Sequence, residues 1–370
     1  MSNQNIHIII SGGGTGGHVF PALSIANAVK EIEPSAELLF VGAKDRLEMR
    51  KVPEAGYQII GLPISGIQRK LSVKNLILPV KLLKSLAMSR RIIKKFKPDV
   101  VVGVGGYASG PVLRVASKKR IPTLIQEQNS YAGITNRLLS KKAEKICVAY
   151  DGMEKYFPEE KIMLTGNPVR KELIPGKDKK EEAAKHFKLD PKRRTILAIG
   201  GSLGAGSINN SIIMHLESLN RKDLQLIWQC GKNYYEKAKV ALEQYNLSNV
   251  ILTPFINRMD LAYSMADVII SRAGAGTISE LALVKKPVIL VPSPNVAEDH
   301  QTRNALSLVK KEAAIMIKDQ EAKDKLLPEA IKITDDEEKR RNLSINIAEN
   351  GKPDSARVIA EEVLKMARKK

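Results

Sequence analysis

Short runs of apolar residues alternate with amphipathic segments of helical period along the whole chain. The expected strands lie at residues 6–10, 37–41, 100–104, 123–126 and 145–149 in the first half, and at 195–199, 225–229, 250–253, 268–271 and 288–291 in the second. Such alternation is typical of a parallel sheet covered by helices. Each half opens with a strand, a glycine-rich loop and a helical pattern. The pattern therefore predicts an α/β chain with two Rossmann-like domains.

Domain boundaries follow from length and from a local change in composition. At 370 residues the chain is more than twice as long as a typical domain of roughly 150 residues. Residues 166–189 contain Pro168, Pro175 and the mixed-charge run KDKKEEAAK, which is typical of a linker. We expect domains at residues 1–167 and 168–352, and a C-terminal helix at 353–370 that packs back on the first domain.

The composition is that of a folded protein without disulfides. Hydrophobic residues make up 43% and charged residues 27%, which excludes wholesale disorder. Cys147 and Cys230 are far apart in the sequence, so neither a structural zinc site nor a disulfide framework is indicated, and a reducing cytoplasm fits best. The N-terminus lacks the basic flank of a signal peptide, and lysines interrupt the longest apolar stretch at 71–89. No membrane-spanning helix is expected.

Positive charge is concentrated in one part of the chain. The formal net charge is +20, and residues 51–150 hold 19 Lys and Arg against 4 Asp and Glu. Residues 69–97 contain ten basic residues and no acidic one. This segment indicates an anionic partner, either nucleic acid or an acidic membrane surface, or else a solvated basic face with no partner. Nucleic acid is disfavoured because Phe96 is the one aromatic residue there, which leaves no stacking platform.

Glycine-rich turns follow four of the expected strands. The first, GGGTGGH, satisfies G-x-G-x-x-G through Gly12, Gly14 and Gly17, and the others lie at residues 103–111, 200–205 and 271–280. The carboxyl ends of parallel strands share one edge of a sheet, so we expect these turns to line a ligand site where backbone N–H groups approach an anion. An NAD-dependent oxidoreductase is disfavoured because the second strand is followed by GAK and not by an acidic residue.

The turns belong to a longer series of motifs. In chain order these read GGGTGGHVFPALSIA, VGGYASGP, EQNSYAGITN, TGNPVR, GGSLGA, SRAGAGTISE and HQTRNA. The series resembles the MurG family of peptidoglycan N-acetylglucosaminyltransferases and extends from Ile6 to about Ala305. Two positions depart from the family: Leu203 stands where many members carry Gln, and Gln126 stands where His is frequent.

The resemblance implies a fold and an activity. The fold is GT-B, two Rossmann-like parallel-sheet domains facing across a cleft. The activity is inverting transfer of N-acetylglucosamine from UDP-GlcNAc to the C4 hydroxyl of undecaprenyl-diphosphate-MurNAc-pentapeptide (lipid I), giving lipid II. The alternatives are another nucleotide-sugar enzyme, such as a lipid glycosyltransferase or a UDP-GlcNAc epimerase, and, from a different class, a basic nucleic-acid-binding protein.

The resemblance places donor binding mainly in the second domain. It implies that the backbone of Ile256 meets the uracil edge and that Glu280 accepts hydrogen bonds from the ribose hydroxyls. Without the family, Glu280 reads as an acidic residue favoured near a helix start. Gln301 and Asn304, three residues apart on one helix face, are expected to reach the sugar hydroxyls. The remaining expected donor contacts are Thr15, Gly16, Gly17, Asn129, Arg170, Ser202, Ala275, Gly276 and Thr277.

Inverting transfer needs a base for the acceptor hydroxyl and a positive environment for the departing UDP. His18 closes the first glycine loop, and imidazole is the side-chain class best suited to act as a base near neutral pH, so it is the first candidate for the base. Glu127 is the second candidate, as base or as an orienting carboxylate, and Tyr107 is expected to shape the acceptor pocket. No Asp-x-Asp motif is present, so no metal is expected to be required, although Mg²⁺ could associate with the diphosphate.

The basic segment is expected to dock the enzyme peripherally on the anionic cytoplasmic face of the membrane, where the lipid acceptor lies. A helix from Pro79 would turn Leu82, Leu86, Ile93 and Phe96 to the core. A second face carries an apolar patch that continues into cations, as an interfacial helix requires. Its residues are Val80, Leu83, Arg90, Arg91 and Lys94. The alternative is that Val80 and Leu83 only widen the core contact while the cations reach solvent.

Overall fold

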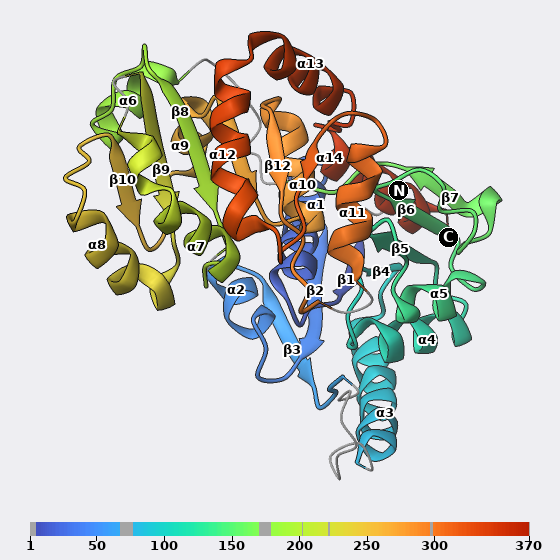
Figure 1. Ribbon diagram of the computed structural model, residues 1–370. Coiled ribbons are helices and arrows are strands. Elements are labelled where there is room, and N and C mark those ends of the chain that lie inside the picture. The colour runs from blue at the N-terminus through green and yellow to red at the C-terminus, as the bar shows by residue number, and fades with distance from the viewer. Residues whose placement is uncertain are drawn as a thin grey trace. The chain divides into compact units, whose positions relative to one another are not determined.

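The computed structural model describes residues 5–66, 77–169, 179–201, 203–220, 223–296 and 299–369. The chain divides into two compact units (Figure 1). The first comprises Met1–Arg170 together with Lys352–Lys370, and the second comprises Lys171–Gly351. The C-terminal helix thus belongs to the first unit. No helix among the described residues is long and apolar enough to cross a membrane.

The first unit is built on a seven-stranded parallel sheet of order β3-β2-β1-β4-β5-β6-β7. Its strands are β1 His7–Ser11, β2 Glu37–Ala43, β3 Gln58–Leu62, β4 Val100–Gly103, β5 Thr123–Glu127, β6 Lys145–Val148 and β7 Ile162–Leu164. Its helices are α1 Gly16–Ile32, α2 Glu48–Glu54, α3 Leu78–Phe96, α4 Ser109–Lys118, α5 Ile134–Ser140, the short η2 Glu159–Lys161 and α14 Ser355–Arg368. Because the strand order reverses between β1 and β4, the loops after these two strands flank the point where open sheets bind ligands.

The second unit repeats the plan with six parallel strands of order β10-β9-β8-β11-β12-β13. The strands are β8 Arg194–Ile199, β9 Leu224–Gln229, β10 Val250–Thr253, β11 Val268–Ser271, β12 Val288–Leu290 and β13 Ile315–Met316. The helices are α6 Lys180–Phe187, α7 Gly206–Met214, η4 Leu216–Leu219, η5 Lys232–Tyr234, α8 Tyr235–Glu243, α9 Met259–Met265, α10 Ala275–Val284, α11 His300–Val309, α12 Ala322–Asp335 and α13 Glu337–Ala348. Here the order reverses between β8 and β11.

All ten expected strands are present, and β3, β7 and β13 are additional. Each added strand lies at or next to a sheet edge and is partly exposed, so it lacks the continuous apolar run of a central strand. The central strands bury both faces. In β1, Ile8 and Ile10 pack in the cluster that contains residues of α1 and α14, whereas Ile9 packs with residues of α3 and α4.

The terminal helix α14 completes the first unit. Ile359 and Val363 are fully buried in the same cluster as the apolar face of α1. The Ser355 hydroxyl donates to the Thr165 carbonyl at 2.7 Å, and the Arg368 guanidinium lies 2.8 Å from the Glu33 carboxylate. The apolar contacts and these two polar ones attach the end of the chain to its beginning.

The core-facing side of α3 differs from the expectation in one respect. Leu86, Ile93 and Phe96 contact the core as expected, but Leu82 is 45% exposed, and Ser85 and Ser89 are fully buried. The two serines are small enough for the close approach of α3 and α4. The Ser89 hydroxyl donates a hydrogen bond to the Ser85 carbonyl at 2.7 Å. Leu82 lies near the N-terminal end of α3, which projects beyond the rest of the unit and leaves the side chain uncovered by the described residues (Figure 1).

Two glycines in the loop after β8 allow a test of how tightly this loop is packed in the second unit. Gly204 has φ +81°, and a Cβ there would collide with the Cys230 carbonyl oxygen, whereas a Cβ on Gly201, at φ +80°, would meet no described atom within 4 Å. We expect Gly201→Ala to cost about 1 to 2 kcal/mol of unfolding free energy, because it adds left-handed strain alone. Gly204→Ala should cost about 2 to 5 kcal/mol because overpacking adds to that strain. Urea unfolding followed by fluorescence of the single, fully buried Trp228 measures the difference, and equal costs would contradict it.

Candidate functional site

The loops after β1 and β4 lie backbone against backbone. A Cβ on Gly12 would collide with the Val104 side chain, and one on Gly106 would collide with the Gly13 carbonyl oxygen. Gly106 also has φ +79°, which strains any other residue. Gly12 and Gly106 are therefore required by the mutual contact of the two loops, and both motifs meet at the switch point of the first sheet.

Glu48, which the sequence analysis did not select, organises the first glycine loop from inside. The side chain is 1% exposed, and its carboxylate accepts hydrogen bonds from the backbone N–H of Gly14 at 2.8 Å and of Ala43 at 2.9 Å. A Cβ on Gly13 would collide with this carboxyl group. The sequence has no acidic residue directly after β2, where a dinucleotide-binding protein would carry one. The structure brings Glu48 to this region from α2, and its carboxylate binds backbone N–H groups of the protein. The sequence signal was an acidic residue at the start of a short helix just after the strand.

His18, Thr15 and the loop after β4 lie together. The Thr15 hydroxyl and His18 Nδ1 are 3.2 Å apart, and a Cβ on Gly105 would lie 3.0 Å from His18 Nε2. One ring nitrogen therefore faces Thr15 and the other faces the second glycine turn. Gly16 and Gly17 form the first turn of α1, so the expected residues of this loop are placed at a helix start.

Tyr107 is 54% exposed and continues the loop after β4. Its ring covers Gly66, because a Cβ on that glycine would collide with it. An exposed, rigid aromatic ring beside a glycine turn can contact a bulky substrate group.

Glu127 is buried and fully engaged by its own loop. Its carboxylate accepts from the backbone N–H groups of Asn129 at 3.1 Å and Gly133 at 3.0 Å, and from Asn136 Nδ2 at 2.8 Å. Burial raises the pKa of Glu127 above its ordinary value, and these hydrogen bonds act in the opposite direction. The arrangement suits a residue that shapes the EQNSYAGITN loop more than one that exchanges protons with a substrate.

Gln126, where the family often has His, ties neighbouring segments together. Its Nε2 donates to Asn167 Oδ1 at 2.9 Å, and Asn167 Nδ2 donates to the Gln128 carbonyl at 3.0 Å. Gln126, the residue that departs from the family pattern, therefore makes a buried side-chain hydrogen bond. Arg170 and Ser202 lie outside the described residues.

In the second unit, two helices begin at the carboxyl edge of the sheet, just after β8 and β11. The helices are α7 and α10, and neither start has a side-chain cap. A Cβ on Gly276 would meet no described atom within 4 Å, so the first turn of α10, with Ala275 and Thr277, has an open side. N–H groups at such a helix start attract phosphate.

Further residues surround α10. Glu280 lies one turn later, half-buried, and accepts a 3.4 Å hydrogen bond from the Tyr263 hydroxyl. Ile256 is 5% exposed and packs in a hydrophobic core cluster of the second unit, and its expected backbone contact with the uracil stays a prediction.

Gln301 and Asn304 share a helix face but not a role. Asn304 is fully buried, and its Nδ2 donates to the Ala273 carbonyl at 3.4 Å, so this side chain supports the loop after β11. Its expected contact with the sugar stays a prediction. Gln301 is half-buried and accepts from the Ser293 N–H at 2.8 Å. Helical spacing predicts that the two side chains share one helix face, but it does not predict that Asn304 is buried more deeply than Gln301.

A half-buried charge network also escaped sequence analysis. The Arg272 guanidinium pairs with Asp319 and donates to the Ser207 hydroxyl at 3.2 Å and to the Val291 carbonyl at 3.1 Å. The network joins the first turn of α7 to the loops after β11, β12 and β13. Its partners are too distant in sequence for any spacing rule to pair them.

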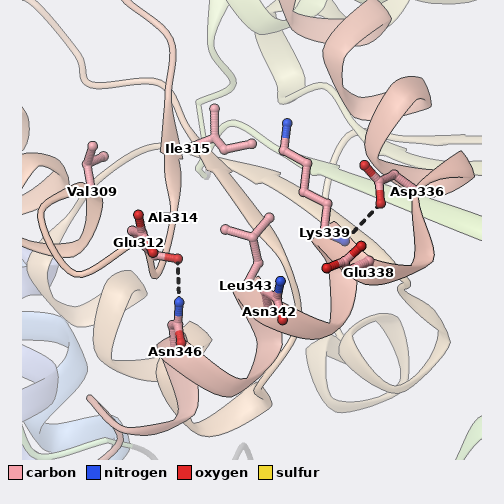
Figure 2. A pocket seen from close by; sticks show the side chains of 10 residues that line it. All are labelled: Val309, Glu312, Ala314, Ile315, Asp336, Glu338, Lys339, Asn342, Leu343 and Asn346. Atoms are coloured by element: carbon pink, nitrogen blue, oxygen red, sulfur yellow. Dashed lines mark hydrogen bonds between the residues drawn. The ribbon is translucent and has the colours of Figure 1, made fainter.

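A cavity of about 420 Å³ lies away from these loops (Figure 2). It is lined by Ala314 and Ile315, at the amino end of β13, and by residues of α13 such as Leu343 and Asn346, whose amide donates to the Glu312 carbonyl at 3.1 Å. It contains none of the expected site residues. Among the described residues, no group of three His, Cys, Asp or Glu side chains could hold a metal ion.

Comparisons with known proteins agree with this architecture. The glycosyltransferase family 28 N-terminal domain matches residues 8–148, and the family 28 C-terminal domain matches residues 195–361. A solved structure of MurG from Acinetobacter baumannii superimposes with a TM-score of 0.80 at 29% identity, covering 97% of this chain and 99% of that one. A UDP-GlcNAc 2-epimerase from Neisseria meningitidis has a TM-score of 0.66 over 98% of this chain and all of its own, but at 14% identity it shows the fold alone.

Relatives at higher identity carry one name. A Bacteroides fragilis protein is 57% identical over 98% of this chain and 96% of its own length, and one from Phocaeicola vulgatus is 58% identical over 99% and 98%. Both are named UDP-N-acetylglucosamine--N-acetylmuramyl-(pentapeptide) pyrophosphoryl-undecaprenol N-acetylglucosamine transferase. The predicted GT-B fold is confirmed, and the chain belongs to glycosyltransferase family 28 and, within it, to the MurG family of N-acetylglucosamine transferases.

Proposed function

We propose that this enzyme transfers N-acetylglucosamine from UDP-GlcNAc to the C4 hydroxyl of the N-acetylmuramyl-pentapeptide carried on undecaprenyl diphosphate. The observation that carries the proposal is the identity of 50–58% with transferases so named, over nearly the whole chain. The direct test is incubation with UDP-GlcNAc and a short-chain lipid I analogue. A disaccharide product and free UDP are expected, whereas hydrolysis or epimerisation of UDP-GlcNAc alone would contradict it.

The donor is held by the second unit in this proposal. The open first turn of α10 receives the diphosphate, Glu280 accepts hydrogen bonds from the ribose hydroxyls, and the backbone of Ile256 meets the uracil edge. A carboxylate at Glu280 pairs well with two hydroxyl donors. N–H groups at the helix start also stabilise the charge that grows on UDP as it departs, without a required metal ion.

The first prediction concerns Glu280. Glu280→Ala should weaken UDP-GlcNAc binding by about 1.5 to 3 kcal/mol, the range for hydrogen bonds to a charged group, and should leave the fold intact because the side chain is only half-buried. Calorimetric titration with UDP-GlcNAc measures the loss. Glu337→Ala, which removes an exposed acidic residue from the first turn of α13, is the matched control. Equal affinity of the two variants would remove Glu280 from the site.

For the chemical step, we propose His18 as the base. The acceptor C4 oxygen attacks the anomeric carbon from the face opposite UDP, so that one C–O bond forms as the bond to phosphate breaks and the configuration inverts. The C4 hydroxyl proton passes to a His18 ring nitrogen. The contact of Nδ1 with Thr15 supports this role because it orients the ring. Glu127 supports the reaction indirectly, through the loop that contains Asn129.

The second prediction separates these two residues. His18→Ala should lower kcat by about 10² to 10⁴ and abolish the acidic limb of the pH–rate profile, because that limb reports protonation of the base. Glu127→Gln should retain the limb while lowering stability and turnover, since it disturbs bonds to Asn129, Gly133 and Asn136. His186→Ala, at an exposed histidine of the second unit, is the control. Loss of the limb in Glu127→Gln alone would exchange the two roles.

The third prediction concerns Glu48 as a positioning residue. Glu48→Ala should lower kcat by about 10- to 100-fold because the first glycine loop loses its internal acceptor and the catalytic geometry shifts. Donor affinity should fall much less than kcat does, since most of the expected donor contacts lie in the other unit. Glu48→Gln, which keeps one carbonyl acceptor, should recover part of the rate, and Glu54→Ala at the exposed end of the same helix should be neutral. A loss of donor affinity equal to the loss of kcat would contradict this role.

Finally, we propose that α3 docks the enzyme on the cytoplasmic face of the membrane. The docking surface consists of Val80, Leu83, Arg90, Arg91 and Lys94, all of which are exposed, and the uncovered Leu82 enlarges its apolar end. Val80 is 50% and Leu83 67% exposed, which disfavours the alternative that they only widen the core contact. Apolar residues followed by cations on one helix face suit an anionic lipid surface.

A further inference from the structure

A second, smaller cavity lies between α3 and α4. Its volume is about 280 Å³, and it is lined by Arg90 and Lys94 from α3 and by Val115, Lys118 and Lys119 from the end of α4. Four of the five lining residues are cationic, and buried Val115 forms the apolar floor. Nothing in the transfer reaction uses this cavity, because it lies at the end of α4 remote from the catalytic loops.

The segment of the chain that lines the cavity carries almost no negative charge. Between Glu54 and Glu127 the sequence has one acidic residue, Asp99, whose carboxylate accepts a 2.9 Å hydrogen bond from the His7 N–H at the start of the sheet. Four cations around one void repel one another unless an anion lies among them. A phosphate group suits such a site, since Arg binds its oxygens through paired N–H donors and Lys contributes point charges.

The cavity and the docking surface face the same way. Arg90 and Lys94 follow Leu83 by seven and eleven residues, which returns each close to the same side of the helix. Arg90 lies about 15 Å along the helix axis from Val80. Apolar contact at one end of α3 and phosphate contact near the other are therefore compatible if the helix lies along a lipid surface.

We propose that the cavity between α3 and α4 binds the phosphate of an anionic phospholipid headgroup. This inference rests on the membrane docking proposed above and adds a discrete headgroup pocket to a diffuse attraction. A lipid is favoured over nucleic acid because the lining has no aromatic ring for stacking and adjoins an exposed apolar patch. With the headgroup in place, α3 lies flat on the membrane.

The experiment compares two double variants of equal charge. Lys118→Gln with Lys119→Gln changes the cavity but no residue of the docking surface. Lys141→Gln with Lys142→Gln removes an exposed lysine pair at the end of α5 and serves as the control. Sedimentation is measured with vesicles of phosphatidylcholine, alone and mixed with phosphatidylglycerol. We expect the cavity variant to bind the mixed vesicles about tenfold more weakly than the control does, whereas bulk electrostatics alone would weaken both equally. Unchanged turnover of a water-soluble acceptor analogue in both variants verifies the fold.

The possible failures are distinguishable. Equal binding of the two double variants to mixed vesicles would overturn the headgroup pocket and leave the docking proposal intact. If the wild type shows no preference for phosphatidylglycerol, or binds as well after Val80→Ser with Leu83→Ser, the docking proposal itself fails. Calorimetric titration with inorganic phosphate tests the other source of the same chemistry. Saturation by free phosphate that leaves vesicle binding unchanged would assign the cavity to a soluble ligand, and displacement from vesicles by duplex DNA would assign it to nucleic acid.

Discussion

The contact between two backbones after β1 and β4 is the constraint on which the first unit depends. No side chain fits where Gly12 meets Val104 or where Gly106 meets the Gly13 carbonyl, so the two loops can approach only as glycines. Their approach places His18 beside Gly105, in the first turn of α1, whose start has no side-chain cap. Glycine in this enzyme therefore supplies proximity between loops as well as access for a ligand.

Both units stabilise their loops with acidic side chains, but in different ways. In the first unit, buried Glu48 accepts from the backbone N–H groups of Gly14 and Ala43, and buried Glu127 accepts from those of Asn129 and Gly133. In the second, Asp319 pairs with Arg272, which reaches Ser207 and the Val291 carbonyl. Because these bonds join groups of the protein itself, they order the loops without any contact from a substrate, and such preorganisation lowers the entropic cost of the reactive arrangement.

The sequence predicted the features that a local pattern marks. It did not predict how deeply a side chain is buried or which residues distant in sequence pair with one another. The central strands and glycine turns were readable because apolar runs and glycines mark them directly. The strands β3, β7 and β13 were missed because short edge strands are half-exposed. The spacing of Gln301 and Asn304 predicted one face, yet only the fold shows that Asn304 is fully buried. Leu82 illustrates the reverse case, an apolar residue on the correct face with nothing described to cover it.

The route of the chain also bears on how the molecule is made. The first unit contains Met1–Arg170 and then Lys352–Lys370, so its core includes residues that are synthesised after the whole of the second unit. Until Ile359 and Val363 have been synthesised, the apolar side of α1 lacks the helix that covers it, although every residue of the second unit has already been added. The unit that carries His18 is thus the first to be started and the second to be completed.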